Sequence, residues 1–167
     1  LENLEITKRS DGLLDVLRKK TEQEPRTVWI DQRYDASTYG SKIVRQITGE
    51  DFPFPKSLPT VQDCLSVVVK NKKSALVLDF FAGSGTTGHA VLELNKEDGG
   101  NRKFILCTNN EVNGIEKELR EKRLSEKEIQ EYGICRKITY PRLEKVIKGY
   151  KKNGDGEKME GLGGNLQ

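Results

Sequence analysis

The fold of this chain is decided by the stretch LVLDFFAGSGTTGHAVLEL, which runs from Leu76 to Leu94. An apolar run ends at the acid Asp79, and three glycines follow in the spacing GxGxxG. The pattern predicts a strand over 74–80, a tight turn, and a helix over 86–97. A second apolar stretch, KFILCT at 103–108, predicts another strand. Strand, helix and strand in this order form a βαβ unit, so the fold class is α/β, with a mostly parallel sheet flanked by helices.

The residues before this unit predict a mixture of helix, strand and loop. We expect a helix capped by Ser10 through DGLLDVLRKK, a strand over 26–30, a helix over 41–49, an extended loop over 52–59 and a helix capped by Thr60 over 61–70. The loop is predicted because Pro53 and Pro55 each favour extended conformations in the preceding residue.

The residues after the unit are more charged. The segment 115–131 predicts an exposed helix, and 134–150 predicts another helix with Pro141 near its start or at a kink. The glycine-rich end, 151–167, indicates a loose tail or the approach to a further strand.

Composition favours one domain with a modest core. Of 167 residues, 34% are hydrophobic and 33% are charged, and the net charge is only +3. Lysines and glutamates are mixed along most of the chain, which is typical of a solvated surface, although a basic excess over 136–152 could contact a phosphate backbone. The chain begins with Leu1, so we expect a piece of a longer polypeptide.

The cysteines and the histidine argue against a disulfide framework and a metal site. Cys64, Cys107 and Cys135 are far apart and lie among apolar neighbours, so we expect reduced, buried residues of a cytoplasmic protein. His89 is the single histidine, and no metal site is expected. Neither a signal peptide nor a membrane-spanning apolar run is visible, and we expect no membrane partner.

The glycine turn is the strongest candidate for a ligand site. A GxGxxG spacing can also form a tight turn that binds nothing, but here it directly follows a strand and opens a helix. Glycines let a ligand approach the backbone closely, and a helix N-terminus presents unpaired N–H groups to an anion.

The chemistry of the turn favours S-adenosyl-L-methionine. Asp79 at the strand end would repel a pyrophosphate but would balance the ammonium and sulfonium of this cofactor. Thr86 and Thr87 could cap the helix and offer hydroxyls to the methionine carboxylate, although Thr86 could equally be a cap alone. We expect at least one of Phe80 and Phe81 to be core. The candidate cofactor-binding residues of the turn are Asp79, Phe80, Phe81, Ala82, Gly83, Ser84, Gly85, Thr86 and Thr87.

A family resemblance supports this interpretation. LDFFAGSGTTGHAV resembles the DPFAGSGTT cofactor motif of amino-group DNA methyltransferases, and FPFPKSLPTVQDCL is similar to the HPTxKP segment that precedes it. The resemblance implies part of a Rossmann-like, class I S-adenosylmethionine-dependent methyltransferase fold. Lys56 then becomes a candidate cofactor-binding residue or remains an ordinary surface lysine. Ser57 and Phe52 depart from the family's second proline and its histidine.

More narrowly, residues 26–167 resemble the C-terminal half of the modification subunit of type III restriction–modification systems. The similar segments are TVWID, GSKIVRQITGEDFPFPKSLPTVQDCL, KFILCTNNE and EGLGGNL. Many methyltransferases bind the cofactor ribose with an acid after the second strand. Thr108 stands at that register, and Asn110 or Glu111 is the preferred ribose-binding candidate.

The family's catalytic tetrapeptide, D/N/S-P-P-Y/F/W, is missing because no two prolines of the chain are adjacent. The resemblance therefore implies the cofactor-binding fragment of a permuted DNA adenine-N6 methyltransferase, inactive alone and without catalytic residues. The expected domains are a helical or linker segment at 1–25, the cofactor-binding half at 26–150 and a glycine-rich tail at 151–167. Expected partners are double-stranded DNA through the parent protein, a restriction subunit and a second copy of the chain.

Three alternatives stay open. An NAD(P)- or FAD-binding domain of an oxidoreductase would use the same GxGxxG, with Glu111 placed 23 positions after Gly88 as the ribose-binding acid. A non-catalytic interaction module could use the charged segment 115–131 or the basic helix after it. A methyltransferase acting on cytosine N4, or on RNA, would have the same cofactor half.

Overall fold

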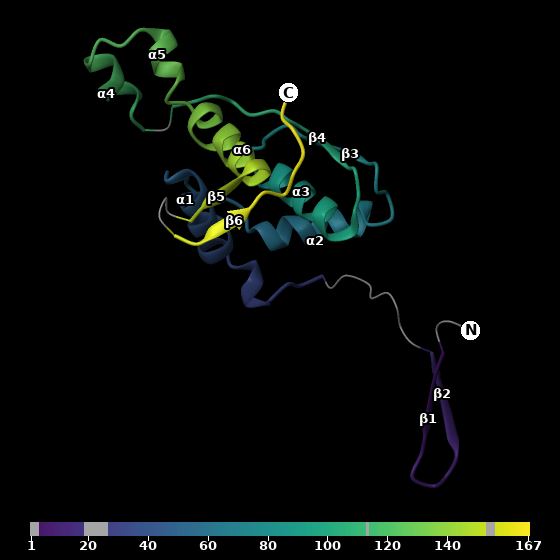
Figure 1. The fold of residues 1–167 in the computed structure, drawn as a ribbon. Helices are drawn as coiled ribbons and strands as arrows, with labels where there is room; N and C mark the ends of the chain where they lie inside the picture. Colours follow the sequence, from purple (N-terminus) through teal and green to yellow (C-terminus); the bar gives the residue numbers. More distant parts are fainter. Residues whose placement is uncertain (1–3, 19–26, 113, 153–155) are drawn as a thin grey trace.

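The computed structural model describes residues 4–18, 27–112, 114–152 and 156–167. The helices are α1 (Lys42–Thr48), α2 (Leu58–Val69), α3 (Thr86–Asp98), α4 (Glu116–Glu121), α5 (Glu126–Gln130) and α6 (Tyr140–Lys148), shown in Figure 1. Shorter helical turns are η1 (Gln32–Tyr34), η2 (Ser37–Ser41) and η3 (Cys135–Thr139). The strands are β1 (Leu4–Lys8), β2 (Leu14–Arg18), β3 (Leu76–Asp79), β4 (Lys103–Leu106), β5 (Gly149–Lys151) and β6 (Lys158–Glu160).

The predicted βαβ unit is confirmed. Strands β3 and β4 are parallel, and Leu76 pairs with Lys103 and Asp79 with Leu106. Helix α3 connects them and ends at Gly99, which is left-handed at φ +66°. Within the described residues the strands form three separate two-stranded sheets, of which β3–β4 is the parallel one. The fold is therefore mixed α/β, with a parallel sheet shorter than the sequence suggested.

The core lies where α1, α3 and α6 meet. Its buried residues are Ile47, Leu92, Leu143 and Val146, and Phe104 and Leu106 from β4 pack against them. Gly88 makes this close packing possible, because a Cβ there would lie 2.9 Å from Leu143 Cδ2 and 3.0 Å from Leu106 Cδ1. The third glycine of GxGxxG therefore serves helix packing.

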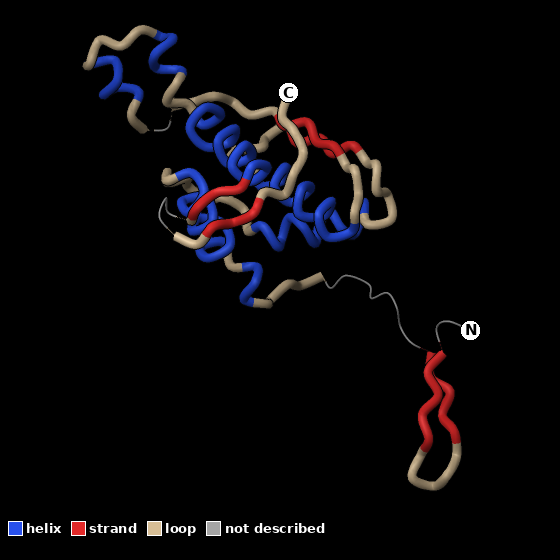
Figure 2. Tube along the Cα trace, viewed as in Figure 1, coloured by secondary structure: helices blue, strands red, loops and turns tan. Residues whose placement is uncertain are grey.

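One face of the β3–β4 sheet is covered, and the other is exposed. Val77 and Phe104 are half-buried on the side of α3 and α6, whereas Leu76, Leu78 and Ile105 alternate with them and are exposed. Figure 2 shows the two strands at the margin of the molecule, with the helices on one side. We name the exposed residues Leu76, Leu78, Phe80, Phe81 and Ile105 the open sheet face.

The helix predicted after Ser10 is wrong. The described residues there form a hairpin, in which Leu14 pairs with Lys8 and the turn at Gly12 has φ +85°. The Asp11–Gly12 pair is a strong hairpin signal, which outweighed the local helical pattern. The strand predicted over 26–30 is also wrong for the described residues 27–30, none of which is assigned to a strand.

The predictions for α1 and α2 are confirmed with one change of boundary. Helix α1 ends at Gly49, which is left-handed at φ +82°. Helix α2 begins at Leu58 instead of after Thr60, because Pro59 fits the first turn of a helix. The proline-rich residues 52–57 before it form a loop, as predicted, but Phe54, which precedes Pro55, has φ of +54° and is not extended as expected, and residues 58–59 belong to α2.

The C-terminal part differs from the prediction in two places. Residues 115–131 form the two short helices α4 and α5 instead of one, separated near Arg123, whose φ is +58°. Ser125 and Glu128 form a capping box that starts α5. The last segment is not a loose tail, because β6 pairs with β5 and the Leu162 N–H then donates to the Val146 carbonyl at 2.9 Å.

The cysteines carry no disulfide, but the expectation that they are buried is wrong. Cys64 and Cys107 are exposed, and Cys135 is half-buried. Among the described residues, none of the helices combines the length and apolar character needed to cross a membrane.

Candidate functional site

The turn between β3 and α3 is closed by backbone hydrogen bonds. The Gly85 N–H donates to the Ala82 carbonyl at 2.8 Å, and the Ala82 N–H donates to the Cys107 carbonyl at 3.0 Å. Gly83 and Gly85 have φ of +49° and +76°, so each needs the left-handed region that glycine adopts without strain. The second bond ties the turn to the end of β4, and the two carboxyl ends of the strands lie together.

Both glycines face protein atoms. A Cβ at Gly83 would lie 3.4 Å from Phe52 Cζ, and one at Gly85 would lie 3.2 Å from Thr139 Cγ2. We expected these glycines to leave room for a ligand. The structure instead assigns them to backbone conformation and to packing against the 52–59 loop and η3.

Asp79 holds the strand end and the helix start together. Its Oδ1 accepts from the Phe81 N–H at 2.9 Å, and its Oδ2 accepts from the Thr87 hydroxyl at 2.6 Å. The carboxylate is half-buried and faces the mouth of the turn. The expectation that Phe80 or Phe81 is core is wrong, because their exposed fractions are 64% and 93%.

The first turn of α3 leaves amides without partners. Its N-cap is Gly85 with no side-chain cap, so the expected capping by Thr86 or Thr87 is wrong. No acceptor among the described residues bonds to the N–H groups of Ser84, Thr86 or Thr87. These amides, together with the helix dipole, form a site for one anionic group.

A buried arginine lies directly behind the turn. Arg142 from α6 donates through Nη1 to the Ser84 carbonyl at 3.1 Å, to Ser84 Oγ at 3.1 Å and to Thr86 Oγ1 at 2.9 Å. The Thr139 hydroxyl donates to the Gly83 carbonyl at 2.6 Å. Two consecutive carbonyls of the turn are therefore held from the α6 side.

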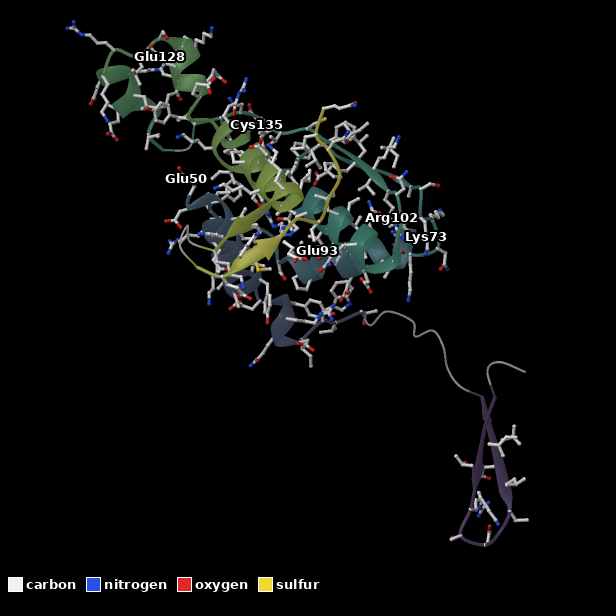
Figure 3. The ribbon with its side chains drawn as sticks, viewed as in Figure 1. Glu50, Lys73, Glu93, Arg102, Glu128 and Cys135 are labelled. Carbon is white, nitrogen blue, oxygen red and sulfur yellow. The ribbon has the colours of Figure 1, made fainter. Side chains whose placement is uncertain are left out.

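The single histidine belongs to the same buried group. Arg142 Nη2 lies 3.2 Å from His89 Nδ1, and His89 Nε2 lies 3.4 Å from Glu93 Oε1. Burial lowers the pKa of His89, which keeps the imidazole neutral. Glu93 is labelled in Figure 3 on α3. Among the described residues, no cluster of three or more His, Cys, Asp or Glu could hold a metal.

The 52–59 loop reaches the turn through Phe52 and not through Lys56. Phe52 packs against Val44, Ile134 and Ile138 as well as against Gly83, so the aromatic ring supports the turn. Lys56 is exposed and has no hydrogen bond or ion pair within the described chain. Its backbone passes so close to Gly40 that a Cβ there would lie 2.7 Å from the Pro55 carbonyl oxygen and 3.1 Å from that of Lys56.

The two ribose candidates differ in what they contact. Asn110 Oδ1 accepts from the Cys135 N–H at 2.9 Å, and its Nδ2 donates to Gln130 Oε1 at 2.8 Å and to the Gln130 carbonyl at 2.9 Å. Asn110 therefore serves as a cap for the helical segment that begins at Cys135. Glu111 is exposed, and its carboxylate has no bond to the described chain.

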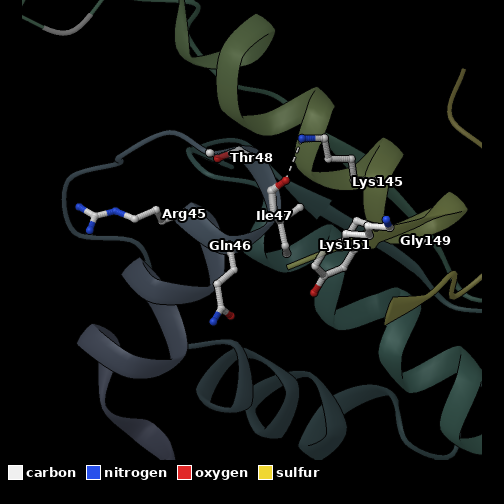
Figure 4. A pocket seen from close by; sticks show the side chains of 9 residues that line it. Arg45, Gln46, Ile47, Thr48, Lys145, Gly149 and Lys151 are labelled. Carbon is white, nitrogen blue, oxygen red and sulfur yellow. Dashed lines mark hydrogen bonds between the residues drawn. The ribbon is translucent and has the colours of Figure 1, made fainter. Parts of the chain in front are cut away.

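The basic excess over 136–152 does not form one free patch. Arg142 is buried, Lys148 pairs with Glu144 at 2.7 Å, and Lys152 pairs with Glu157 at 2.7 Å. Lys145 donates to the Ile47 carbonyl at 2.9 Å, and both residues line a pocket of about 660 Å³, shown in Figure 4. Most of these cations are therefore engaged by the protein itself.

The comparisons agree with the geometry of the turn. A family model described as DNA methylase matches residues 2–127, three quarters of the chain. The chain belongs to the DNA methylase family.

The chain is also similar to several curated proteins of restriction–modification systems and to a type II methyltransferase. The methylase chain is 40% identical over 90 residues to the Mod subunit of the type III restriction–modification enzyme EcoPI of Escherichia phage P1, covering 54% of this chain and 14% of the relative. It is 47% identical over 70 residues to the StyLTI Mod subunit of Salmonella typhimurium, covering 41% and 10%. It is also 40% identical over 85 residues to the type II methyltransferase M.KpnI of Klebsiella pneumoniae, covering 51% and 20%. The chain thus spans between 10% and 20% of the length of these relatives.

The sequence alone did not identify Thr139, Arg142 and His89 as neighbours of the candidate site. Arg142 was grouped with exposed basic residues, although it lies on one helix face with Leu143 and Val146, both of which are buried. A basic residue within an apolar stripe of a helix is the signal that could have identified it.

Proposed function

We propose that this chain is the S-adenosyl-L-methionine-binding half of a DNA methyltransferase that methylates adenine N6 in a restriction–modification system. Family membership supports the reaction class, and the Mod-subunit relatives support a type III restriction–modification system. The adenine target is proposed from the family resemblance of the sequence. The observation that carries the proposal is the arrangement of opposite charges at the turn. The Asp79 carboxylate lies at the strand end, and the free amides of Ser84, Thr86 and Thr87 lie at the start of α3.

The negative carboxylate and the free amides match the charged groups at the amino-acid end of the cofactor. Asp79 would accept from the ammonium and attract the sulfonium, while the amides would bind the carboxylate. The bound cofactor supplies an activated methyl group. The residues of this chain bind and orient it, and we assign this role to Asp79 through Thr87, with Lys56 and Glu111 at the edge of the site. Asn110 would act through the backbone of η3 instead of contacting the ribose.

We further propose that the fold is part of a Rossmann-like class I methyltransferase domain and that the parent protein supplies the pocket for the target base. The open sheet face supports this proposal, because the corresponding helical layer is absent from that side among the described residues. In this scheme residues 1–25 are a linker segment, 26–150 the cofactor half and 151–167 its C-terminal extension. Double-stranded DNA, a restriction subunit and a second copy would bind the parent in the cytoplasm.

Calorimetric titration of the purified chain separates the proposed function from dinucleotide binding. We expect heat and a raised melting temperature with S-adenosyl-L-methionine and with its demethylated product, and no response to NADH or FAD. A response to NADH or FAD without one to S-adenosyl-L-methionine would reverse the assignment. For the acceptor, we expect a D/N-P-P-Y tetrapeptide in the parent gene, and its absence would contradict the adenine assignment.

A further inference from the structure

Among the described residues two arginines are buried, and they differ in whether a carboxylate balances their charge. Arg102 pairs with Asp98 through both carboxylate oxygens, at 2.9 Å and 2.8 Å, and lies near Lys73 in Figure 3. Arg142 is fully buried but makes no ion pair with a carboxylate among the described residues, and its Nε has no hydrogen-bond partner. Burying a guanidinium without a counter-charge costs free energy, and a functional role for Arg142 would explain why this cost is tolerated.

The contacts of Arg142 define the protonation of its neighbour. Because a guanidinium can only donate, His89 Nδ1 must accept, and the proton of the neutral imidazole is then on Nε2, which faces Glu93. The neutral ring therefore separates Arg142 from the half-exposed Glu93 carboxylate. The positive charge behind the turn stays largely unneutralised.

The contacts also fix the peptide planes of the turn. All described peptide bonds are trans, so a carbonyl and the following N–H point in opposite directions. Thr139 holds the Gly83 carbonyl on the α6 side, and the Ser84 N–H therefore points away from α6. Arg142 holds the Ser84 carbonyl on the same side, while the Gly85 N–H closes the turn onto Ala82.

We propose that Arg142 is a positioning residue that makes the turn selective for ligands carrying a carboxylate. It orients the turn through Ser84 and Thr86, and it places a positive charge behind the free amides that would bind the anion. The inference rests on the proposed function, because the carboxylate in question is that of S-adenosyl-L-methionine. The ligand would contact the amides and not the arginine.

The test compares two ligands that differ in the carboxylate alone. S-adenosyl-L-methionine and its decarboxylated form both carry the sulfonium, the amino group and the adenosine. By calorimetry, the wild-type chain should bind the carboxylated ligand about tenfold or more tightly, the effect of a charge-assisted hydrogen bond. In Arg142→Met, the affinity for S-adenosyl-L-methionine should fall about tenfold, while that for the decarboxylated ligand should change by no more than about twofold.

Two further variants keep the test independent of folding effects. Arg142→Lys retains a positive charge and should retain part of the preference for the carboxylate. Arg102→Lys changes the other buried arginine, at the opposite end of α3, and should lower the melting temperature without changing the preference.

The outcomes separate the inference from the proposed function. If Arg142→Met weakens the affinity for both ligands by the same factor, the inference is overturned. If Arg142→Met does not fold, the same result in Arg142→Lys overturns it. So would a wild-type chain that binds both ligands equally well, although the proposed function would then stand. A wild-type chain that binds neither ligand would remove the proposed function itself.

Discussion

Thr86 and Thr87 are adjacent at the start of α3, yet their hydroxyls serve opposite sides of the turn. The Thr86 hydroxyl accepts from Arg142 beneath the turn, and the Thr87 hydroxyl donates to Asp79 at its mouth. Successive residues of a helix point about 100° apart, which places them on different faces. At this scale the chemistry of a residue is set by the face on which it lies.

The first residue-scale prediction concerns Asp79. Asp79→Asn removes the negative charge at the strand end and should weaken S-adenosyl-L-methionine binding by about 1–3 kcal/mol, the range for a charge-assisted hydrogen bond. Calorimetric titration measures this loss. Asp51→Asn is the control, because Asp51 is exposed and pairs with Arg45 away from the turn. Unchanged affinity in Asp79→Asn would place the cofactor elsewhere.

A second residue-scale prediction concerns pH. The pKa of His89 is lowered in the folded chain from 6.5 by burial, with the charge of Arg142 acting in the same direction and Glu93 opposing both. Below about pH 6.5 the unfolded chain therefore binds more protons than the folded chain, so stability falls as the pH decreases toward the folded pKa. The slope contributed by this residue is at most about 1.4 kcal/mol per pH unit.

Chemical denaturation at a series of pH values checks this expectation. The free energy of unfolding should fall as the pH decreases below about 6.5 in the wild type and should fall less in His89→Gln. The groups facing the imidazole are Arg142 and Glu93, and both remain in the variant. Identical pH profiles for the two proteins would show that His89 does not titrate in this range.

At the scale of elements, the site depends on how α6 and η3 are anchored beneath the turn. Asn110, which follows β4, caps this segment through the Cys135 N–H. Gly133 makes the approach possible, because a Cβ there would lie 2.3 Å from Asn110 Oδ1. The end of β4 thus positions the helix that carries Thr139 and Arg142.

The element-scale prediction separates the two ribose candidates. Asn110→Ala should destabilise the chain by about 1–2 kcal/mol through the lost cap and leave the intrinsic affinity for S-adenosyl-L-methionine within about twofold. Glu111→Gln should change stability by less than about 0.5 kcal/mol and weaken binding by about 1 kcal/mol or more. Denaturation and calorimetry on both variants measure the two effects. The opposite pattern would identify Asn110 as the ribose ligand.

At the scale of the molecule, the main feature is the unequal covering of the β3–β4 sheet. Phe81 is 93% exposed and is one of the five exposed apolar residues that define the open sheet face. Exposed apolar side chains gathered on one face are typical of a contact region. In the proposed parent, this is the side on which the rest of the domain would pack.

The molecular-scale prediction is that this face makes the isolated chain bind hydrophobic dyes and self-associate. The double variant Leu78→Ser/Phe81→Ser should lower the fluorescence of bound anilinonaphthalene sulfonate and should reduce association in sedimentation velocity. Its free energy of unfolding should change by less than about 0.5 kcal/mol, because the exposed side chains contribute little to the core. Val28→Ser is the control, since Val28 is exposed but outside this face. Equal effects of the control and the double variant would contradict the assignment.

The sequence by itself determined the parts that depend on local pattern. The βαβ unit, the presence of a loop before α2 and the stop of α1 at Gly49 follow from periodicity and backbone sterics within a few residues. Local pattern failed at the N-terminal hairpin, where the pairing of β1 with β2 outweighed a helical pattern.

Only the tertiary structure decided how the turn is supported. The contacts of Arg142 with Ser84, Thr139 with Gly83 and Asn110 with Cys135 join residues separated by 58, 56 and 25 positions. Their partners are set by how α6 packs against α3 and β4, and helical spacing specifies which face is buried but not what that face meets. The lysine- and arginine-rich segment 136–152 therefore has the composition of a solvated surface, although its Arg142 is buried behind the turn.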